Sequence, residues 1–524
     1  MMGIWLFDLR IEAAIPHYPN ACIKWNEQPD RYGMSPVKKI LFLLFALIGF
    51  AVPMVQGQEI GLDGARHLLN RTGFSASDSD IREYALLTRD LAVNRLLKRV
   101  VTTALAAPPS WVDEPPLPPY KMSEMSDEER MLLRVRNLER GLELREWWYR
   151  EMLTTPSPLS EKMTLFWHNH FATSLQKVRF AQLMYRQNVL LRRNALGNFA
   201  TLLREVARDP AMVIYLDSAQ NRRELPNENF AREVMELFTL GEGNYSEKDI
   251  REVARAFTGW SIDRTTGDFL FRPGIHDNGR KTVLGKSGDF DGNAVLDILL
   301  DHPRTAEFIS RKLWKEFLSP APDDEEIHRF ARIFRNSRYD IKTLLRAMLT
   351  SDTFYASENR AALVKSPVEL IVGTLKQFDL APPTLRPFVI AGAFLGQNLL
   401  APPNVKGWTG GEAWLNSTTL LGRRQFTERI LGKEDDAEEF MTKRARHAEG
   451  SFRESRMLRR MEKGMGWMRA DLENWSKQFK PEDREQAITR TLLAISPRNP
   501  PNFKPDDVAG LVRRLVTDPA YQLK

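Results

Sequence analysis

The chain has 524 residues, of which 43% are hydrophobic and 27% are charged, and it contains one cysteine. This balance is typical of a folded globular protein and excludes disordered, collagen-like, disulfide-rich and multi-spanning membrane proteins. The net charge of +7 is small for a chain of this length. Because no basic cluster precedes the C-terminal quarter, we expect no nucleic acid partner.

An apolar segment near the N-terminus predicts export. Lys38 and Lys39 precede the apolar run 40–55, and small residues end the segment at Gly57. A basic region, a short apolar stretch and a small-residue cleavage site are the three parts of a signal peptide. The run is shorter than the roughly 20 residues of a membrane span, which disfavours an uncleaved anchor. We therefore assign 34–57 as the signal peptide of a periplasmic or secreted protein, with no stable membrane span after cleavage.

Residues 1–33 do not fit the start of a signal peptide, because polar and aromatic stretches come before the lysines. The simplest explanation is that translation starts at Met34 and that 1–33 is mis-assigned upstream sequence. Cleavage after Gly57 would remove Cys22, the only cysteine. The mature chain of 467 residues would then carry a net charge of +6, with no disulfides and no thiolate for catalysis or metal binding.

Apolar residues recur at helical spacing along the mature chain, which predicts a mainly α fold, a multi-helical globular array with long ordered loops. Capping boxes at Ser126 with Glu129 and at Ser246 with Asp249 mark the starts of two helices. The first helix runs to about residue 153. Further helices are predicted near 60–71, 78–105, 161–171, 179–207, 228–240, 293–301, 304–318, 324–334, 341–350 and 367–378. The glycine-rich segment 259–291 can hold one short β-hairpin.

Two features indicate how the mature chain is divided. Six prolines in 108–119 bracket Trp111 and predict a stiff, extended strap. Only about 50 mature residues precede this strap, too few for an independent core, so we expect it to cross the surface of one domain. Charge density rises after Gly432. We therefore distinguish a helical core, 58–431, from a charged helical C-terminal part of the same domain, 432–524.

The segment 166–171, FWHNHF, contains a His-x-His pair. This spacing suits metal ligands on an extended backbone. On a helix, residues two apart point about 200° from each other, so His168 and His170 cannot face one ion. His170 would instead share a face with Met163, Phe166 and Trp167. Two interpretations stay open: bonded core or surface histidines, or ligands that converge where a helix ends at Phe171.

The segment 227–237, NENFAREVMEL, places carboxylates and an arginine on one predicted helix. Glu233 and Glu236 share a polar face, and Arg232 can pair with Glu228 or Glu236 one turn away. Paired carboxylates can hold a metal ion or act as acid and base. A solvated face of salt bridges explains the same spacing with fewer assumptions.

The loop 272–279, RPGIHDNG, places His276 and Asp277 among turn-forming residues. Such residues can be ligands or catalysts, but turn chemistry alone also selects Asp, Asn and Gly. The following segment 289–293 resembles a calcium loop, yet it lacks the glycine at position six and the glutamate at position twelve. We assign Asp291 or Asn293 to helix capping instead.

The loop 402–416 contains Trp408 and Trp414 among glycines and prolines. Indole rings in such a loop can stack on sugar rings, or they can fill the core. The chain contains no G-x-S-x-G elbow, Walker A loop, dinucleotide-binding G-x-G-x-x-G or H-E-x-x-H motif. The sequence therefore does not favour a common nucleotide-binding enzyme, a lipase or a zincin.

In this order, these segments resemble the large bacterial family catalogued as domain of unknown function 1800. The resemblance covers essentially the whole chain after the signal peptide. The chain carries Phe238 where many relatives have a histidine, which weakens any metal site at that position. The matching segments include ARHLLNR at 65–71, FWHNHF at 166–171, DPAM at 209–212, NENFAREVMEL at 227–237, ARAFTGW at 254–260 and NVKGWTGGEAW at 404–414.

The resemblance implies an exported, mainly helical protein, often encoded beside an exported protein similar to alkaline phosphatases and sulfatases. Our first hypothesis is a metal-dependent hydrolase that acts on a cell-envelope or extracellular polymer. Glu233 or Glu236 would act as base on a bound water, and Arg232 would neutralise an anionic substrate. The divalent metal ion would be held by His168, His170, His276 and Asp277.

The alternative hypothesis is a non-catalytic periplasmic or surface protein for binding or assembly. The same polar residues would then lock loops together. Trp408 and Trp414 would contact the co-encoded exported partner or a glycan. The two hypotheses differ in whether the histidines meet around one ion.

Overall fold

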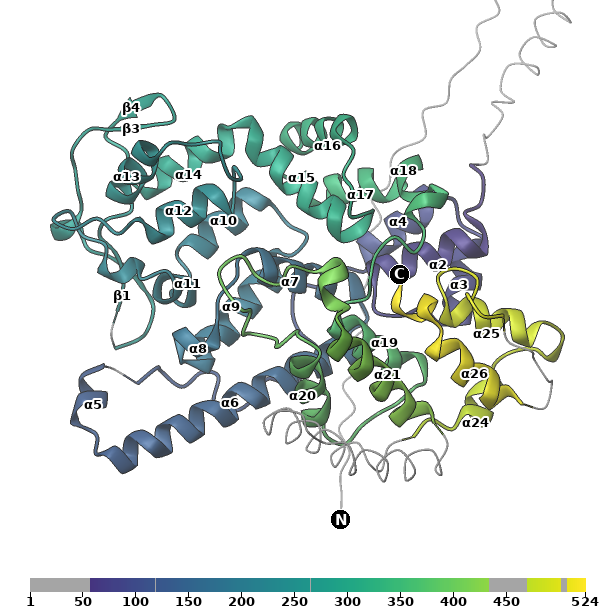
Figure 1. The fold of residues 1–524 in the computed structure, drawn as a ribbon. Coiled ribbons are helices and arrows are strands. Elements are labelled where there is room, and N and C mark those ends of the chain that lie inside the picture. Colours follow the sequence, from purple (N-terminus) through teal and green to yellow (C-terminus); the bar gives the residue numbers. More distant parts are fainter. Residues whose placement is uncertain (1–56, 118, 264, 433–468, 501–506) are drawn as a thin grey trace, which may run out of the picture. The chain divides into compact units, whose positions relative to one another are not determined.

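The computed structural model describes residues 57–117, 119–263, 265–432, 469–500 and 507–524. Helices dominate these residues, and their strands form two short antiparallel hairpins (Figure 1). The prediction of a mainly α fold is confirmed. Residues 1–33 and the predicted signal peptide, up to residue 56, lie outside the described residues. No helix in the described ranges is both long enough and apolar enough to cross a membrane.

The first described helices are α2 (Gly61–Thr72), α3 (Asp78–Ala85) and α4 (Arg89–Lys98). The single helix predicted over 78–105 is wrong, because the chain turns after Ala85 and α4 ends at Lys98. The Thr88 hydroxyl accepts a hydrogen bond from the Leu91 backbone N–H at 3.4 Å and caps α4. The apolar spacing continues through this cap, so the sequence pattern does not show that the helix is broken here.

Helices α5 (Pro119–Glu124) and α6 (Asp127–Thr154) follow the proline-rich strap. The predicted capping box is confirmed: Ser126 Oγ accepts from the Glu129 N–H at 3.2 Å, and Glu129 Oε2 accepts from the Ser126 N–H at 2.7 Å. The strap lies along α6, where buried Trp111 donates from Nε1 to Glu143 at 2.6 Å. It therefore covers part of the core, as predicted.

The central helices are α7 (Pro158–His170), α8 (Leu175–Val178), α9 (Ala181–Asn194), α10 (Phe199–Ala207) and α11 (Pro210–Tyr215). The single helix predicted over 179–207 is wrong, because the chain breaks at 195–198. Asn198 ends this break: its Oδ1 accepts from the Thr201 N–H at 3.1 Å, and its Nδ2 donates to the carbonyl of Arg338 at 2.6 Å. The apolar spacing continues across this cap as well, so the periodicity alone did not predict the break.

The next segments are η1 (Ser218–Gln220), α12 (Glu228–Glu236) and α13 (Glu247–Ala256). The capping box of Ser246 with Asp249 at the start of α13 is confirmed. The glycine-rich segment forms two hairpins where one was predicted, with η2 (Pro273–Ile275) between them. The hairpins pair β1 (Trp260–Ile262) with β2 (Phe269–Phe271), and β3 (Lys281–Val283) with β4 (Lys286–Gly288).

Asp291 caps α14 (Gly292–Asp301), since its Oδ1 accepts from the Ala294 N–H at 2.8 Å. The assignment of this residue to capping is confirmed. The remaining elements are α15 (Pro303–Phe317), α16 (Asp324–Asn336), α17 (Ile341–Thr350), α18 (Asp352–Tyr355), η3 (Ser357–Asn359), α19 (Pro367–Gln377), α20 (Arg386–Phe394), η4 (Gly411–Trp414), α21 (Ser417–Leu431), α24 (Leu472–Ser476), η5 (Pro481–Asp483), α25 (Arg484–Leu492), α26 (Val508–Thr517) and η6 (Pro519–Gln522).

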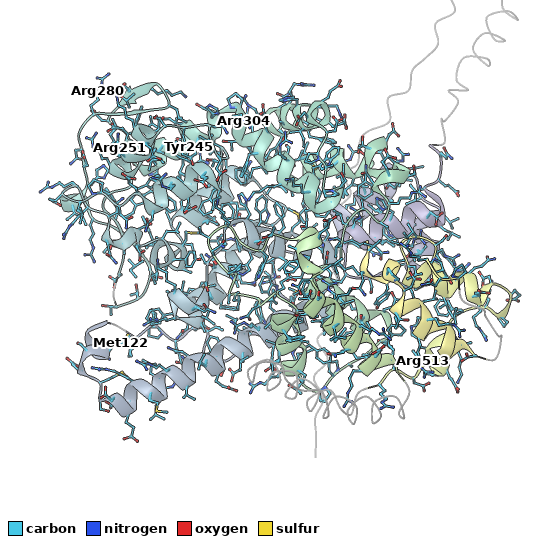
Figure 2. The ribbon with its side chains drawn as sticks, in the orientation of Figure 1. Met122, Tyr245, Arg251, Arg280, Arg304 and Arg513 are labelled. Carbon is cyan, nitrogen blue, oxygen red and sulfur yellow. The ribbon has the colours of Figure 1, made fainter. Side chains whose placement is uncertain are left out.

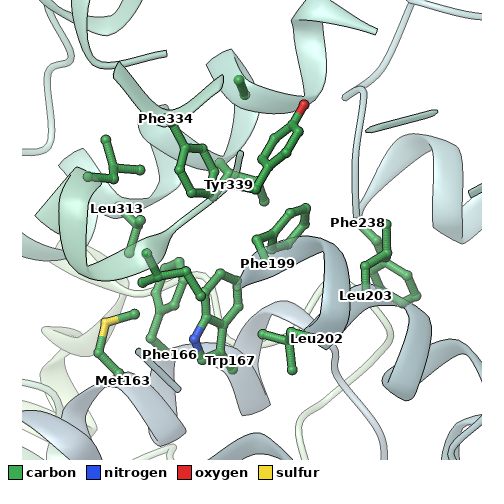
Figure 3. Close-up of a cluster of buried hydrophobic side chains, with 14 of the residues drawn as sticks. Met163, Phe166, Trp167, Phe199, Leu202, Leu203, Phe238, Leu313, Phe334 and Tyr339 are labelled. Carbon is green, nitrogen blue, oxygen red and sulfur yellow. The ribbon is translucent and has the colours of Figure 1, made fainter. Parts of the chain in front are cut away.

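Two hydrophobic clusters form the interior. The first includes α7, α10 and α12–α17, and Figure 3 shows its Trp167, Phe199 and Phe334 packed together. The second joins the C-terminal half of α6 to α19–α21 and α24–α26. Trp475 and Val512 belong to this second cluster, so the described C-terminal residues pack into the same compact unit, 57–524.

Candidate functional site

His168 lies in aromatic surroundings inside the protein. Its ring centroid is 5.4 Å from that of Trp148 and 5.7 Å from that of Trp408. Burial, with a smaller effect from the charge of Arg145, lowers the pKa of His168 to about 3, so the imidazole is neutral at physiological pH. Its Nε2 atom is buried and makes no hydrogen bond within the described part of the chain.

His170 contacts a different set of rings at the end of α7. It stacks on Phe166 and meets Trp167 edge-on, so the predicted shared face is confirmed. The ring of Phe238 lies 6.0 Å from it between centroids. Burial lowers the pKa of His170 well below its usual value. The two histidines are therefore separate core residues that do not converge where α7 ends.

Asn169, between the two histidines, joins α7 to the loop 402–408. Its Oδ1 accepts from the Trp408 N–H at 2.7 Å, and its Nδ2 donates to the Trp408 carbonyl at 3.2 Å. The loop comes so close that a Cβ on Gly407, whose φ is +78°, would lie 2.2 Å from Asn169 Oδ1. Sequence reasoning missed Asn169. The signal for it was an amide on an apolar helix, because a buried amide needs partners.

The C-terminal half of α12 brings carboxylates to the same loop. Glu236 accepts a hydrogen bond from the Tyr245 hydroxyl at 2.7 Å, and one of its oxygens lies 3.6 Å from Lys406 Nζ. Tyr245, labelled in Figure 2, stands just before α13. Lys406 also pairs with Glu242 at 3.2 Å. The ends of α7 and α12 therefore both contact the loop 402–408, so the structure joins three of the segments singled out in the sequence.

Glu233 lies one turn before Glu236 and is partly buried. Burial and the negative charge of Glu236 raise the pKa of Glu233, and the charges of Lys406 and Arg232 oppose this shift. A carboxyl group that holds its proton to a higher pH beside a second carboxyl group is an arrangement used in acid–base catalysis. Glu233 is therefore the stronger candidate for an acid or base on α12.

Arg232 is occupied by ion pairs that tie α12 to α13. Its guanidinium donates two hydrogen bonds of 2.9 Å to Glu247, and it lies 3.4 Å from Glu228, the pairing predicted one turn away. The hydrogen bonds to Glu247 raise the pKa of Arg232. Neutralising a substrate would require breaking this two-pronged pair, so the structure gives Arg232 a connecting role.

His276 and Asp277 pack against α13 and the chain that follows it. His276 Nδ1 lies 2.8 Å from the Thr258 carbonyl oxygen and 3.2 Å from the Thr258 hydroxyl. Asp277 accepts two hydrogen bonds from Arg255, at 2.7 and 3.2 Å. The Arg255 hydrogen bonds lower the pKa of Asp277. Both residues hold the loop 272–279 in place.

The structure does not bring the four predicted metal ligands together. Each imidazole has its own set of neighbours, and Asp277 is paired with an arginine. Among the residues that the structure describes, no three His, Cys, Asp or Glu side chains are placed to hold one metal ion. The predicted set was His168, His170, His276 and Asp277.

Trp408 and Trp414 are both buried. Trp408 packs on His168, and the Trp414 carbonyl accepts from the Thr419 hydroxyl at 2.8 Å. Of the two interpretations of this loop, the structure supports indoles that fill the core. Neither ring is exposed for stacking on a sugar.

A family model described as "Protein of unknown function (DUF1800)" matches residues 67–523. The chain belongs to this family. The resemblance inferred from the motifs is thereby confirmed, and the DUF1800 match includes Asn169, Glu236 and Lys406 with the segments that carry them. The searches of curated proteins and of solved structures each found no match.

Proposed function

We propose that this protein is an exported, non-catalytic binding or assembly protein and that α6 carries its contact with a protein partner. The observation that carries the proposal is a row of exposed apolar side chains on the N-terminal half of α6. Contiguous apolar surface of this kind marks interaction sites. The members of this α6 row are Met131, Leu132, Val135 and Leu138, with exposed fractions of 66%, 59%, 56% and 70%.

The α6 row continues a stripe that the same helix buries further along. Met131, Val135 and Leu138 are spaced by four and three residues, so they lie on one side of the helix. Tyr149 lies on the same side and is buried against α20, where a Cβ on Gly392 would be 2.3 Å from the Tyr149 hydroxyl oxygen. In Figure 1, α20 accompanies only the C-terminal half of α6. A helix of the partner can extend this packing over the other half.

The occupant that we infer is an amphipathic helix of the co-encoded exported protein similar to alkaline phosphatases and sulfatases. Arg134 and Arg136 lie on the two sides of the α6 row, are exposed, and form no ion pair within the described ranges. Their charge favours acidic residues beside the apolar face of the partner helix. Complementary flanking charge of this kind fixes the register of a helix pair.

The polar motif residues support the same function. Asn169 holds Trp408, Arg232 holds Glu247, and Arg255 holds Asp277. These contacts fix loops against helices, which is the role that the non-catalytic hypothesis gave them. With the two tryptophans buried, α6 replaces them as the proposed surface for the partner.

The double substitution Leu132→Glu with Leu138→Glu should weaken binding of the co-encoded partner at least 100-fold. Each buried leucine contributes about 1.5–3 kcal/mol, and the two carboxylates would lose solvent in the interface. The measurement is the dissociation constant between the two purified proteins. The control is Leu420→Glu with Leu421→Glu, an apolar pair on α21 that is about half exposed, which should leave the constant unchanged.

Unchanged affinity in the α6 variant would contradict the proposal. Sedimentation of the chain alone tests a second copy as the occupant. If the wild type is a dimer and the α6 variant a monomer, the row serves self-association, and the proposed contact with the exported partner is wrong.

Glu233 favours a second candidate function, a hydrolase acting on a cell-envelope or extracellular polymer. Its raised pKa beside Glu236 suits a general acid or base. We expect Glu233→Gln to slow hydrolysis of isolated envelope fragments by about 100-fold or more, while Glu228→Gln, at the partly exposed start of the same helix, retains the wild-type rate. Assays run with and without added Zn²⁺ or Mg²⁺ test the metal requirement. No hydrolysis by the wild type in any of them contradicts this function.

A further inference from the structure

Strand β2 leaves one of its backbone edges without a partner. Its inner edge pairs with β1 and the residues beside it, where the Arg272 N–H and the Asp268 carbonyl make hydrogen bonds of 2.8 and 2.7 Å. In an antiparallel pair, the backbone groups of successive residues point alternately toward the partner strand and away from it. The N–H and C=O groups of Phe269 and Phe271 therefore point outward, and none of them bonds to a described residue.

The side chains of β2 leave this outer edge unprotected. Leu270 and Phe271 are 37% and 41% exposed. Edge strands of natural proteins often carry a lysine or a proline, which discourages pairing with another chain. The second hairpin has such a residue, since Lys286 on β4 is about half exposed. The three residues of β2 include neither lysine nor proline, so its edge is open to a further strand.

The sequence DFLFR, which contains β2, is complementary to itself in antiparallel pairing. A two-fold axis at Leu270 sets the two leucines opposite each other and sets Phe269 of each copy opposite Phe271 of the other. The same axis sets Asp268 of each copy opposite Arg272 of the other. In this register the outward backbone groups of the phenylalanines face one another, so each phenylalanine pair exchanges both of its backbone hydrogen bonds.

The two charged residues of this segment are available to a second copy. Arg272 forms no ion pair with a described residue, and the nearby Asp263 accepts its hydrogen bonds from two backbone N–H groups instead. Asp268 is mostly exposed and pairs with Arg186 through Oδ1 at 3.1 Å, which leaves Oδ2 for a second guanidinium. Opposite charges that face each other across an antiparallel pair stabilise it, and like charges destabilise it.

We propose that β2 pairs with β2 of a second copy of this chain, so that the two hairpins form one continuous antiparallel sheet across a two-fold axis. Such an interface uses the same surface on both copies, which is the commonest arrangement in protein oligomers. A strand pair this short buries less than the roughly 1,600 Å² of a standard interface, so we expect a micromolar dissociation constant. This surface shares no residue with the α6 row, so the dimer does not depend on the proposed function.

Sedimentation of the purified chain from about 1 to 100 µM tests the pairing, and we expect a shift from monomer to dimer over this range. Leu270→Lys sets two ammonium groups opposite each other at the axis and should weaken the dimer about tenfold or more. Leu86→Lys, at a leucine that is 70% exposed, is the matched control and should dimerise like the wild type. The α6 variant, Leu132→Glu with Leu138→Glu, should also dimerise; its conversion to a monomer would place self-association on the α6 row and overturn this proposal.

Reversing the charges tests the register itself. Asp268→Lys sets like charges opposite each other on both sides of the axis and should weaken the dimer about tenfold. Adding Arg272→Asp to this variant reverses both ion pairs and should restore the dissociation constant to within about threefold of the wild type. This recovery also guards against a folding defect. A wild type that stays monomeric at the highest concentration, a dimer that Leu270→Lys leaves unchanged, or a double variant that does not recover would overturn the proposal.

Discussion

Arg192→Met is expected to lower the free energy of unfolding by about 3–5 kcal/mol, because it leaves the carboxylate of Glu161 buried without its counter-charge. Arg192 donates from Nε and Nη2 to the two oxygens of Glu161, at 2.5 and 2.9 Å. Both side chains are completely inaccessible to solvent. Trp148 Nε1 also donates to Glu161 at 2.8 Å, but a neutral donor cannot replace the guanidinium.

The next residue in the chain supplies the control. Arg193, on the exposed side of α9, pairs with Glu205 of α10 at 2.7 Å, so Arg193→Met should cost less than about 1 kcal/mol. Urea unfolding of both variants gives the comparison. Substituting both partners, Glu161→Met with Arg192→Met, should cost less than Arg192→Met alone, because no charge stays buried. Similar losses for Arg192→Met and Arg193→Met would show that burial does not govern the strength of this pair.

The helices that the sequence predicted correctly are those whose signals are local. The caps at Ser126, Ser246 and Asp291 follow from residues three apart, and each lies where it was predicted. The breaks before Thr88 and Asn198 were missed, because apolar spacing continued across them. Asn198 is also fixed by the Arg338 carbonyl, a partner 140 residues away that no local pattern shows.

The candidate site also combines features that local motifs predict with features that depend on contacts between distant residues. The sequence predicted that the segment 166–171, the helix 228–236 and the loop 272–279 would surround one site. The ends of α7 and α12 instead meet the loop 402–408, and the loop 272–279 packs against α13 and the residue Thr258 that follows it. Which atoms meet depends on contacts such as Asn169 with Trp408, 239 residues apart. The sequence pattern of a His-x-His pair is the same whether its rings bind an ion or, as for His168, pack against two indoles. Burial decides between these cases, and it is a property of the assembled fold.

Asp209→Asn is expected to remove a contribution to the free energy of unfolding that, in the wild type, falls by roughly 3–4 kcal/mol between about pH 4 and pH 7. Asp209 caps α11, where its Oδ2 accepts from the Met212 N–H at 3.0 Å and from Gln187 Nε2 at 2.7 Å. Burial nevertheless raises the pKa of Asp209 to about 7, since these hydrogen bonds compensate only in part. An unfolded aspartate titrates near 3.9.

The direction of the effect follows from proton binding. Between these two pKa values the folded chain holds a proton on Asp209 that the unfolded chain has lost, so the contribution of Asp209 to stability is greatest below about pH 4 and falls until the pH passes 7. Asparagine keeps an oxygen for the Met212 N–H but does not titrate. Urea unfolding at several pH values between 4 and 8 should therefore give a shallower pH dependence for Asp209→Asn. Asp291→Asn, at the cap of α14, should retain the wild-type slope, and a slope retained by Asp209→Asn as well would assign the titration to another group.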